Sequence, residues 1–207
     1  MPNNSSIIQM NVNNKAVLPS FVPHINAWRN LMIRTAMVDR NFSQATHVTQ
    51  VNISMRKPGV PHQFIINSKN SHAKPLLNQE DYVLVEHVEK NATQLIASGL
   101  FEPHDHALLH SWLYQLDDQI HSVIQLHNAD ILTQRTDLDI DQTKQTIQSP
   151  KALHQEIVEL FQQTSVRHKR LFVLNDTQPS VVAFGRNPFE ASMVLTDYTI
   201  KALEKMQ

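Results

Sequence analysis

The chain has 207 residues, of which 41% are hydrophobic and 18% are charged, and its formal net charge is −1. This size and composition are typical of one folded domain with a full core, and they exclude a disulfide-stapled miniprotein and a disordered chain. The balanced charge provides no global positive field, so we expect no nucleic-acid partner.

The rare residue types narrow the chemistry further. The absence of cysteine excludes disulfides, thiolate catalysis and Cys-based zinc sites, and it leaves twelve histidines and the carboxylates as strong metal donors. Three glycines are too few for a Walker-type or GxGxxG nucleotide loop. No apolar run approaches the roughly 18 residues that span a bilayer, and the N-terminus has no signal-peptide pattern. We therefore expect a cytoplasmic protein with no membrane partner.

The first half of the chain alternates between helical and strand patterns. Residues 1–22 are predicted to be a polar N-terminal arm, and residues 23–207 a single domain. Apolar residues at helical spacing predict an amphipathic helix after the arm: Ile25, Trp28, Met32 and Ala36. Apolar and polar residues alternate in VNISMRK (51–57), which predicts a strand, and KPGVP with HQFIIN (62–67) completes a hairpin. YVLVEH (82–87) predicts a third strand, whereas 88–103 shows no single period.

The second half repeats this alternation. A helix is predicted from an apolar face: Leu109, Trp112, Leu113, Leu116 and Ile120. A buried strand follows at SVIQLHN (122–128), and RLFVLN (170–175) and SVVAFG (180–185) are two more, separated by the turn DTQP. Ser149-Pro150 and Asn187-Pro188 each place a capping residue before a proline and predict helix starts. The last helix runs through Phe189, Met193, Ile200 and Leu203. Interleaved helices and strands indicate a layered α/β domain.

The order of these pieces resembles the class II aldolase/adducin family. VNISMR (51–56) is similar to the family's GNISVR strand, FIINSKN (64–70) to its phosphate loop, and LLNQEDYVLVE (76–86) to its "ltpeDlvvvd" strand. HALLHSWLYQLDDQIHSVIQLHN (106–128) is similar to the E-x-x-x-H-x-x-x-Y helix and H-x-H strand. The pair LFVLN/SVVAFG and EASMVLTDYTIKALE (190–204) are similar to the N-H-G turn and the final helix. The resemblance extends over about residues 23–205.

The resemblance implies a three-layer αβα fold with a mainly antiparallel central sheet. It also implies a homo-oligomer, most often a tetramer, with active sites between subunits. In the family's enzymes three histidines hold a divalent metal, typically zinc, and a glutamate moves the proton while the metal stabilises an enediolate made from a sugar phosphate.

Carried over by position, the metal histidines fall on Gln125, His127 and Pro179, and the catalytic glutamate falls on His106. Two of the three imidazoles are therefore replaced, one by an amide and one by a residue with no donor. We expect no metal or a weakly bound divalent metal, zinc if any, held by His127, Gln125 and His106. His106 is the candidate catalytic residue, and the resemblance places His110 beneath the site.

The resemblance also implies an anion site built from Asn52, Ser68, Lys69 and Asn70, with a small anionic metabolite as partner. Asn67-Ser68-Lys69-Asn70 stands where the family has a Thr-Pro-Ser-Gly-like turn. Asn70 can adopt a positive φ, Lys69 would contribute a charge, and Asn52 and Ser68 would contribute hydrogen bonds. The alternative is that these are solvated loop residues.

Two functions remain open at this point. His104, His106 and His110 lie close in sequence, and a rebuilt metal site of His106 and His127 with Gln125 or Asp176 is chemically possible, since imidazole suits zinc, nickel or copper. The alternatives are metal-free acid–base catalysis or histidines that only form hydrogen bonds. The protein is then either a noncatalytic binding or assembly module, as in the head domain of adducin, or an aldehyde-lyase-like enzyme, epimerase or dehydratase acting on a small sugar phosphate. The missing ligands favour the noncatalytic module.

Overall fold

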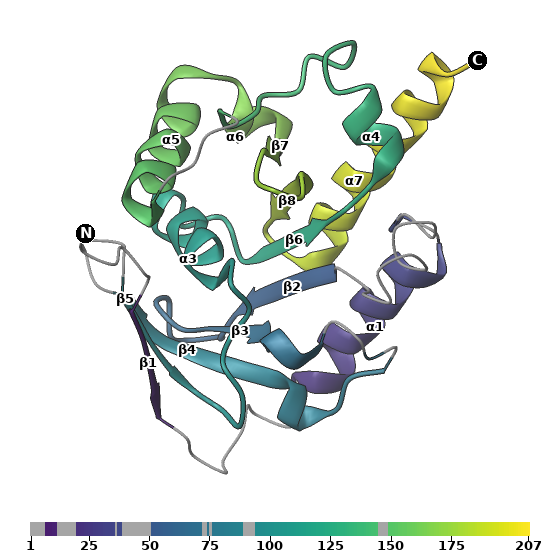
Figure 1. Cartoon of the computed structure of the whole chain (residues 1–207). Helices are drawn as coiled ribbons and strands as arrows, with labels where there is room; N and C mark the ends of the chain where they lie inside the picture. The colour runs from purple at the N-terminus through teal and green to yellow at the C-terminus, as the bar shows by residue number, and fades with distance from the viewer. Residues whose placement is uncertain are drawn as a thin grey trace.

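The computed structural model describes residues 7–11, 20–35, 37–38, 51–71, 74, 76–88, 94–144 and 149–207. They form a three-layer αβα domain around an eight-stranded sheet with the order β1-β5-β4-β3-β2-β6-β8-β7 (Figure 1). The strands are β1 Ile7–Asn11, β2 Val51–Arg56, β3 Phe64–Asn67, β4 Tyr82–Val88, β5 Gln94–Ser98, β6 Ser122–Leu126, β7 Leu171–Leu174 and β8 Ser180–Gly185. All neighbours pair antiparallel except β1 and β5, which are parallel. The predicted mainly antiparallel αβα fold is confirmed.

The helices cover the two faces of this sheet. They are α1 Val22–Arg34, α3 Ala107–Leu116, α4 Ala129–Thr133, α5 Pro150–Gln163, α6 Val166–Lys169 and α7 Pro188–Lys205, with short 3-10 turns at Lys69–Ser71 and Gln79–Asp81. α3 and α5 lie on one face, and α1, α4 and α7 lie on the other (Figure 1). Each face buries its own apolar cluster, because side chains alternate between the two sides of every strand.

The predicted helix starts are confirmed at both cap-plus-proline pairs. Ser149 Oγ accepts a hydrogen bond from the Ala152 backbone N–H at 3.2 Å, and Asn187 Oδ1 accepts one from the Glu190 N–H at 2.9 Å. Proline follows each cap, where its missing N–H has no helical partner to lose. These helix starts are local features, which is why the sequence predicts them.

Three expectations are corrected or fall outside the described residues. Part of the expected arm is strand β1, because its backbone pairs with β5 and forms the edge of the sheet, and β5 itself lies in the stretch 88–103 that showed no period. Asn70 lies in the 3-10 turn and does not use the positive φ that asparagine can adopt, since among the described non-glycine residues only Asp139 and Arg170 have positive φ. Ala36 lies outside the described residues.

α7 leaves an apolar stripe exposed on its outer side. Its buried side consists mostly of small residues, including Ala191, Ser192 and Ala202, which allow the helix to lie close to the sheet. The exposed fractions of the outer large side chains range from 46% to 58%: Phe189, Met193, Ile200 and Leu203. None of the helices in the described part of the chain combines the length and the apolar character needed to cross a membrane.

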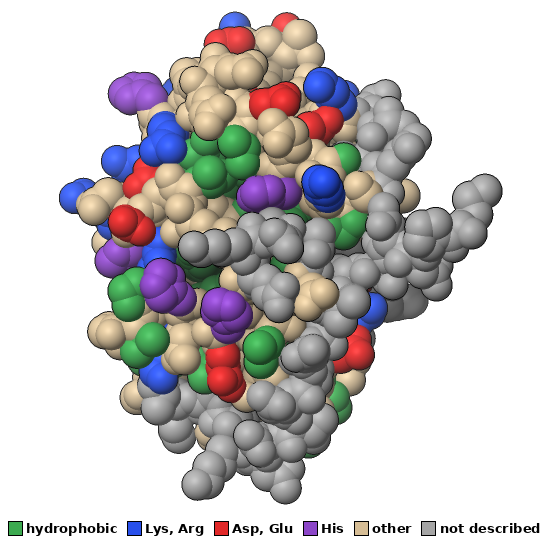
Figure 2. All heavy atoms as spheres, turned by 90° about the vertical axis from the view of Figure 1, so that its left-hand side faces the viewer, with side chains coloured by type: hydrophobic (Ala, Val, Ile, Leu, Met, Phe, Trp, Pro, Cys, Tyr) green, Lys and Arg blue, Asp and Glu red, His purple; other side chains and the backbone are tan. Residues whose placement is uncertain are grey.

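Figure 2 shows a different face, the left-hand side of Figure 1. Histidine side chains are spread over it from the upper left to below its centre, with acidic and basic groups scattered among them. In the cavity lined by Arg56, His62, His87 and Tyr114, the Arg56 guanidinium donates to the backbone carbonyls of Pro61, Tyr114, Asp117 and Ile120. Most N–H groups of Arg56 are therefore used within the fold.

Candidate functional site

The candidate site forms where three strand ends and one helix start meet. Asn52 at the start of β2 pairs in register with Gln125 near the end of β6, and Ser180 begins β8 on the other side of β6. The start of α3 brings His104 and His106 to the same edge of the sheet. Eleven residues line a cavity of about 220 Å³: Asn52, His104, Asp105, His106, Gln125, Leu126, His127, Asp176, Thr177, Gln178 and Ser180.

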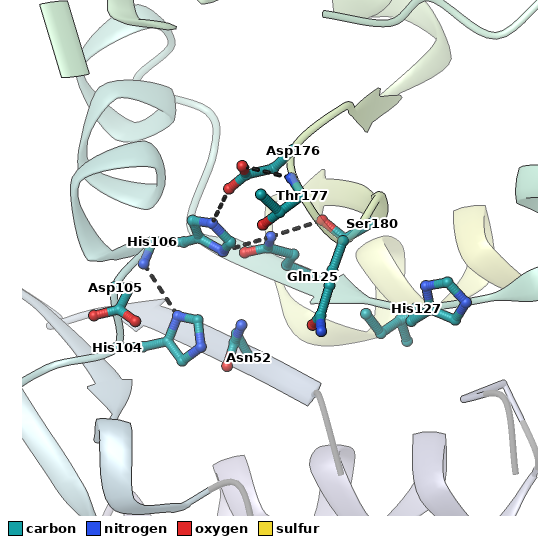
Figure 3. A pocket seen from close by; sticks show the side chains of 11 residues that line it. Asn52, His104, Asp105, His106, Gln125, His127, Asp176, Thr177 and Ser180 are labelled. Carbon is teal, nitrogen blue, oxygen red and sulfur yellow. Dashed lines mark hydrogen bonds and ion pairs between the residues drawn. The ribbon is translucent and has the colours of Figure 1, made fainter. Parts of the chain in front are cut away.

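A hydrogen-bonded network centred on Gln125 crosses this cavity (Figure 3). Gln125 Nε2 lies 2.8 Å from His106 Nδ1 and 2.8 Å from Ser180 Oγ. His106 Nε2 lies 3.4 Å from Asp176 Oδ2, and the His106 backbone N–H donates to His104 Nδ1 at 3.1 Å. Side chains from β6, β8, the β7–β8 turn and the start of α3 are thereby held together.

The network assigns the proton positions on His106. An amide nitrogen is only a donor, so Gln125 Nε2 donates to His106 Nδ1, which then carries the lone pair. Neutral His106 therefore carries its proton on Nε2 and donates it to Asp176. This hydrogen bond is the largest cause of a lowered pKa of Asp176. Both ring nitrogens of His106 are thus occupied by protein groups.

A second buried layer lies directly beneath this network, as the resemblance implied for His110. His110 Nδ1 lies 2.7 Å from Ser54 Oγ, which in turn lies 2.6 Å from the Tyr114 hydroxyl. The pKa of His110 is lowered to about 3, mainly by burial and also by the neighbouring His106, whereas the Gln125 side chain opposes the shift. Burial also raises the pKa of Tyr114. His110 is therefore a neutral core residue at physiological pH.

His127 lies across the cavity from His106 (Figure 3). Its Nδ1 lies 2.8 Å from the backbone carbonyl of Pro179, in the turn between β7 and β8. A carbonyl only accepts, so Nδ1 carries the proton and Nε2 carries the lone pair, which is a tautomer that metal-binding histidines commonly adopt. His106, Gln125 and His127 all line the cavity, and Pro179 adjoins them through the hydrogen bond between its carbonyl and His127.

These residues do not fit the three-histidine metal site that the resemblance implies. His106 uses both ring nitrogens within the protein, and Pro179 has no donor side chain. The oxygen of Gln125, the amide atom that binds metals, is buried without a hydrogen-bond partner among the described residues and is shielded from the cavity. Nor do any three His, Asp or Glu residues of the described part of the chain form a cluster arranged for a metal ion.

The residues carried over for an anion site are only partly brought together. Asn52 lines the cavity, and its Oδ1 accepts a hydrogen bond from Asn67 Nδ2 at 3.1 Å. Ser68 is fully buried, and its hydroxyl has no hydrogen-bond partner among the described residues. Lys69 and Asn70 are exposed and are not among the lining residues. The structure does not gather these four residues around one point.

Sequence reasoning missed five of the described lining residues: Asp105, Leu126, Thr177, Gln178 and Ser180. Thr177, Gln178 and Ser180 lie in or next to the DTQP turn, which the sequence marks as a turn but not as part of a site. Asp105 stands between two histidines, and this run of polar side chains before a helix was the available signal for it. Asp176 was considered only as an additional metal donor.

Comparison with known proteins agrees with this geometry. The profile of the Class II Aldolase and Adducin N-terminal domain matches residues 35–195, and no curated protein sequence matches the chain. An L-fuculose 1-phosphate aldolase shares the fold with a TM-score of 0.67 at 13% identity, over 93% of this chain and 90% of that one.

Two further solved structures share the fold. A sugar-phosphate aldolase from Thermotoga maritima has a TM-score of 0.63 at 13% identity, over 90% of this chain and 95% of the other. The N-terminal class II aldolase domain of a protein from Thermoplasma acidophilum has a TM-score of 0.62 at 11% identity, over 95% and 99%. With most of its length matched by the family profile and its fold shared with these proteins, the chain belongs to the class II aldolase and adducin family.

Proposed function

We propose that this protein is a noncatalytic binding or assembly module with a class II aldolase fold. One observation carries the proposal: the groups at the family's metal position bind each other. Gln125 Nε2 donates to His106 and Ser180, and His106 donates to Asp176. A site of this kind provides no open coordination sphere, so the Lewis acid on which the family's chemistry depends has no place to bind.

Two measurements on protein purified without a His tag test this proposal. Elemental analysis is expected to find far less than one equivalent of zinc per chain. Retro-aldol cleavage of sugar 1-phosphates with added zinc is expected at background, since losing even one group that stabilises an oxyanion typically costs about 10² to 10³ in rate. Stoichiometric zinc together with a turnover of about 1 to 10³ per second would contradict the proposal.

A second candidate function is supported by the His106–Asp176 pair. A carboxylate 3.4 Å from an imidazole in a polar cavity is a common arrangement for acid–base chemistry. In that case the protein is an enzyme, such as an epimerase or dehydratase, in which His106 moves a proton. The lowered pKa of Asp176 keeps its carboxylate charged and able to orient the ring. Activity lost on His106→Gln and unaffected by a chelator would favour this second function.

Assembly into a homo-oligomer, most often a tetramer, is part of the proposal. The exposed apolar stripe on α7, formed by Phe189, Met193, Ile200 and Leu203, supports it, because monomers rarely leave large contiguous apolar surfaces in water. We also place the protein in the cytoplasm, an assignment supported by a chain without cysteine. Light scattering at micromolar concentration is expected to give several times the chain mass of 23.7 kDa.

A further inference from the structure

We propose that Asp105 excludes phosphate from the cavity, so that the site takes a small hydroxyl-rich molecule with no phosphate or carboxylate group. The proposal rests on the proposed binding function and specifies its ligand. It makes Asp105 a specificity-determining residue. Three independent features of the structure carry it: the charge of the cavity lining, the backbone of the 68–71 turn, and the polar groups that face the cavity.

The charge of the lining disfavours an anion. The described residues that line the cavity include two carboxylates, Asp105 and Asp176, and no lysine or arginine. The ammonium of Lys69, which is not among these lining residues, lies 2.8 Å from Asp105 Oδ1. The hydrogen bond that the Lys69 ammonium donates to Asp105 raises the pKa of Lys69, so the ammonium stays charged beside the carboxylate. Lys69, the cation that the resemblance assigns to an anion site, is therefore already paired with Asp105, which lines the cavity.

The backbone of the 68–71 turn also offers few donors. Phosphate-binding turns work by pointing free N–H groups at the ligand. Here the Ser68 N–H donates to the Asp81 carbonyl at 2.7 Å, and the Lys69 N–H donates to the Glu102 carbonyl at 3.0 Å. The Ser71 N–H donates to the Ser68 carbonyl at 3.1 Å. These three N–H groups are used within the fold and are not available to bind an anion.

The remaining lining groups suit hydroxyls. Asn52 directs its amide nitrogen toward the cavity (Figure 3), while its oxygen accepts from Asn67. Thr177, Gln178 and Ser180 add hydroxyl and amide groups from the β7–β8 turn. A hydroxyl both donates and accepts, and it can therefore bond to amides and to the two carboxylates alike. A phosphate or carboxylate is negatively charged at neutral pH and would meet Asp105 and Asp176 with like charge.

Titration with inorganic phosphate tests the role of Asp105 directly. Chelator-treated wild type and Asp105→Asn are compared by calorimetry, with the side-chain amide NMR signals of Asn52 and Gln125 reporting cavity occupancy. Asp105→Asn is expected to bind phosphate at least about tenfold more tightly, which corresponds to about 1.4 kcal/mol, because Lys69 is released and one carboxylate is removed. Adding Lys69→Met to this variant should remove most of the gain.

The matched control is Asp118→Asn, which removes the same charge just beyond the opposite end of α3. It should bind phosphate like the wild type. Wild type that binds phosphate in the cavity as tightly as Asp105→Asn would overturn the inference. A gain that is undiminished by Lys69→Met or that appears in Asp118→Asn would also overturn it, because net charge rather than the Lys69–Asp105 pair would then be responsible.

The ligand class is tested with glucitol and glucitol 6-phosphate. For the wild type, attaching phosphate should not improve binding, whereas for Asp105→Asn it should. Tighter binding of the phosphate to the wild type would contradict the inference while leaving the proposed noncatalytic function standing. Stoichiometric zinc before chelation would instead contradict the proposed function and leave the phosphate comparison between the two variants valid.

Discussion

Gln125 Nε2 lies 2.8 Å from His106 Nδ1, and this hydrogen bond occupies the lone pair through which His106 would bind a metal. The two residues are nineteen positions apart, yet strand β6 and the start of α3 hold them in contact in a largely buried setting. The same amide nitrogen also binds Ser180, so Gln125 joins three segments of the chain. Several measurable consequences follow from this contact and from the layer beneath it.

Restoring the missing imidazoles should create a zinc site. The double variant Gln125→His/Pro179→His removes the amide that occupies His106 and adds two donors near His127 Nε2. We expect zinc affinity at least about 100-fold above wild type, the scale on which single changes around metal sites act. Calorimetric titration with zinc measures it, and Pro179→Ala is the control. Zinc binding to the double variant no tighter than to the wild type would show that the position-by-position assignment is wrong.

Ser54→Ala should destabilise the fold. Its hydroxyl bonds both His110 Nδ1 and the Tyr114 hydroxyl, at 2.7 and 2.6 Å, and all three residues are buried. Removal leaves two buried polar atoms with unmet hydrogen bonds, and a loss of about 2 to 3 kcal/mol in the free energy of unfolding is expected. Urea denaturation measures the loss. Ser165→Ala, at an exposed position, should change stability by less than about 0.5 kcal/mol.

His110 should make stability depend on pH in the acid range. Its pKa in the folded protein is about 3, below the ordinary 6.5, so the unfolded chain takes up the proton first as the pH falls. The associated stability is complete above pH 6.5 and is lost between pH 6.5 and about 3. His110→Asn should reduce the slope of unfolding free energy against pH in this window by about 1.4 kcal/mol per pH unit.

The control for this measurement is His168→Asn, which alters an exposed histidine on α6. Its slope should match that of the wild type. Equal slopes for His110→Asn and the wild type would mean that His110 becomes protonated in the folded protein near its ordinary pKa, against the buried arrangement described above.

Gly185→Ala should be more costly than Gly99→Ala. A Cβ added at Gly185 would lie 2.7 Å from Glu190 Cβ and 3.0 Å from the Ala191 nitrogen, so the start of α7 would have to move away from β8. At Gly99 the nearest atom would be 3.3 Å away, at the side chain of Val83. We expect a loss of about 1 to 3 kcal/mol at Gly185 and a smaller loss at Gly99, measured by thermal unfolding.

Met193→Lys should weaken the proposed homo-oligomer. Met193 is 48% exposed in the middle of the α7 stripe, and a lysine there would place a charge inside an apolar interface. Light scattering is expected to shift toward the 23.7 kDa monomer on dilution. Gln162→Lys, an exposed change on α5 across the sheet, should leave the assembly unchanged. Identical masses for both variants would place the interface elsewhere.

Much of the fold could be predicted because its signals are local. The caps at Ser149 and Asn187 each bond a backbone N–H three residues ahead. The alternation of apolar and polar residues that predicts β2 lies within six consecutive residues. Gln125 and His127 are two residues apart and therefore emerge on the same side of the sheet.

The tertiary structure decided the rest, because the contacts concerned join distant residues. Lys69 meets Asp105, and His106 meets Asp176, across 36 and 70 positions, and no local pattern encodes either pair. β1 was missed because the sequence around it is polar, and because the backbone pairing with β5 that makes it a strand joins residues far apart in the chain. Likewise, the small residues of α7 face the sheet, and its larger apolar side chains lie on the exposed side of the helix. Local sequence thus determined which elements form and which residues reach the site, while long-range packing decided which lone pairs and charges are left for a ligand.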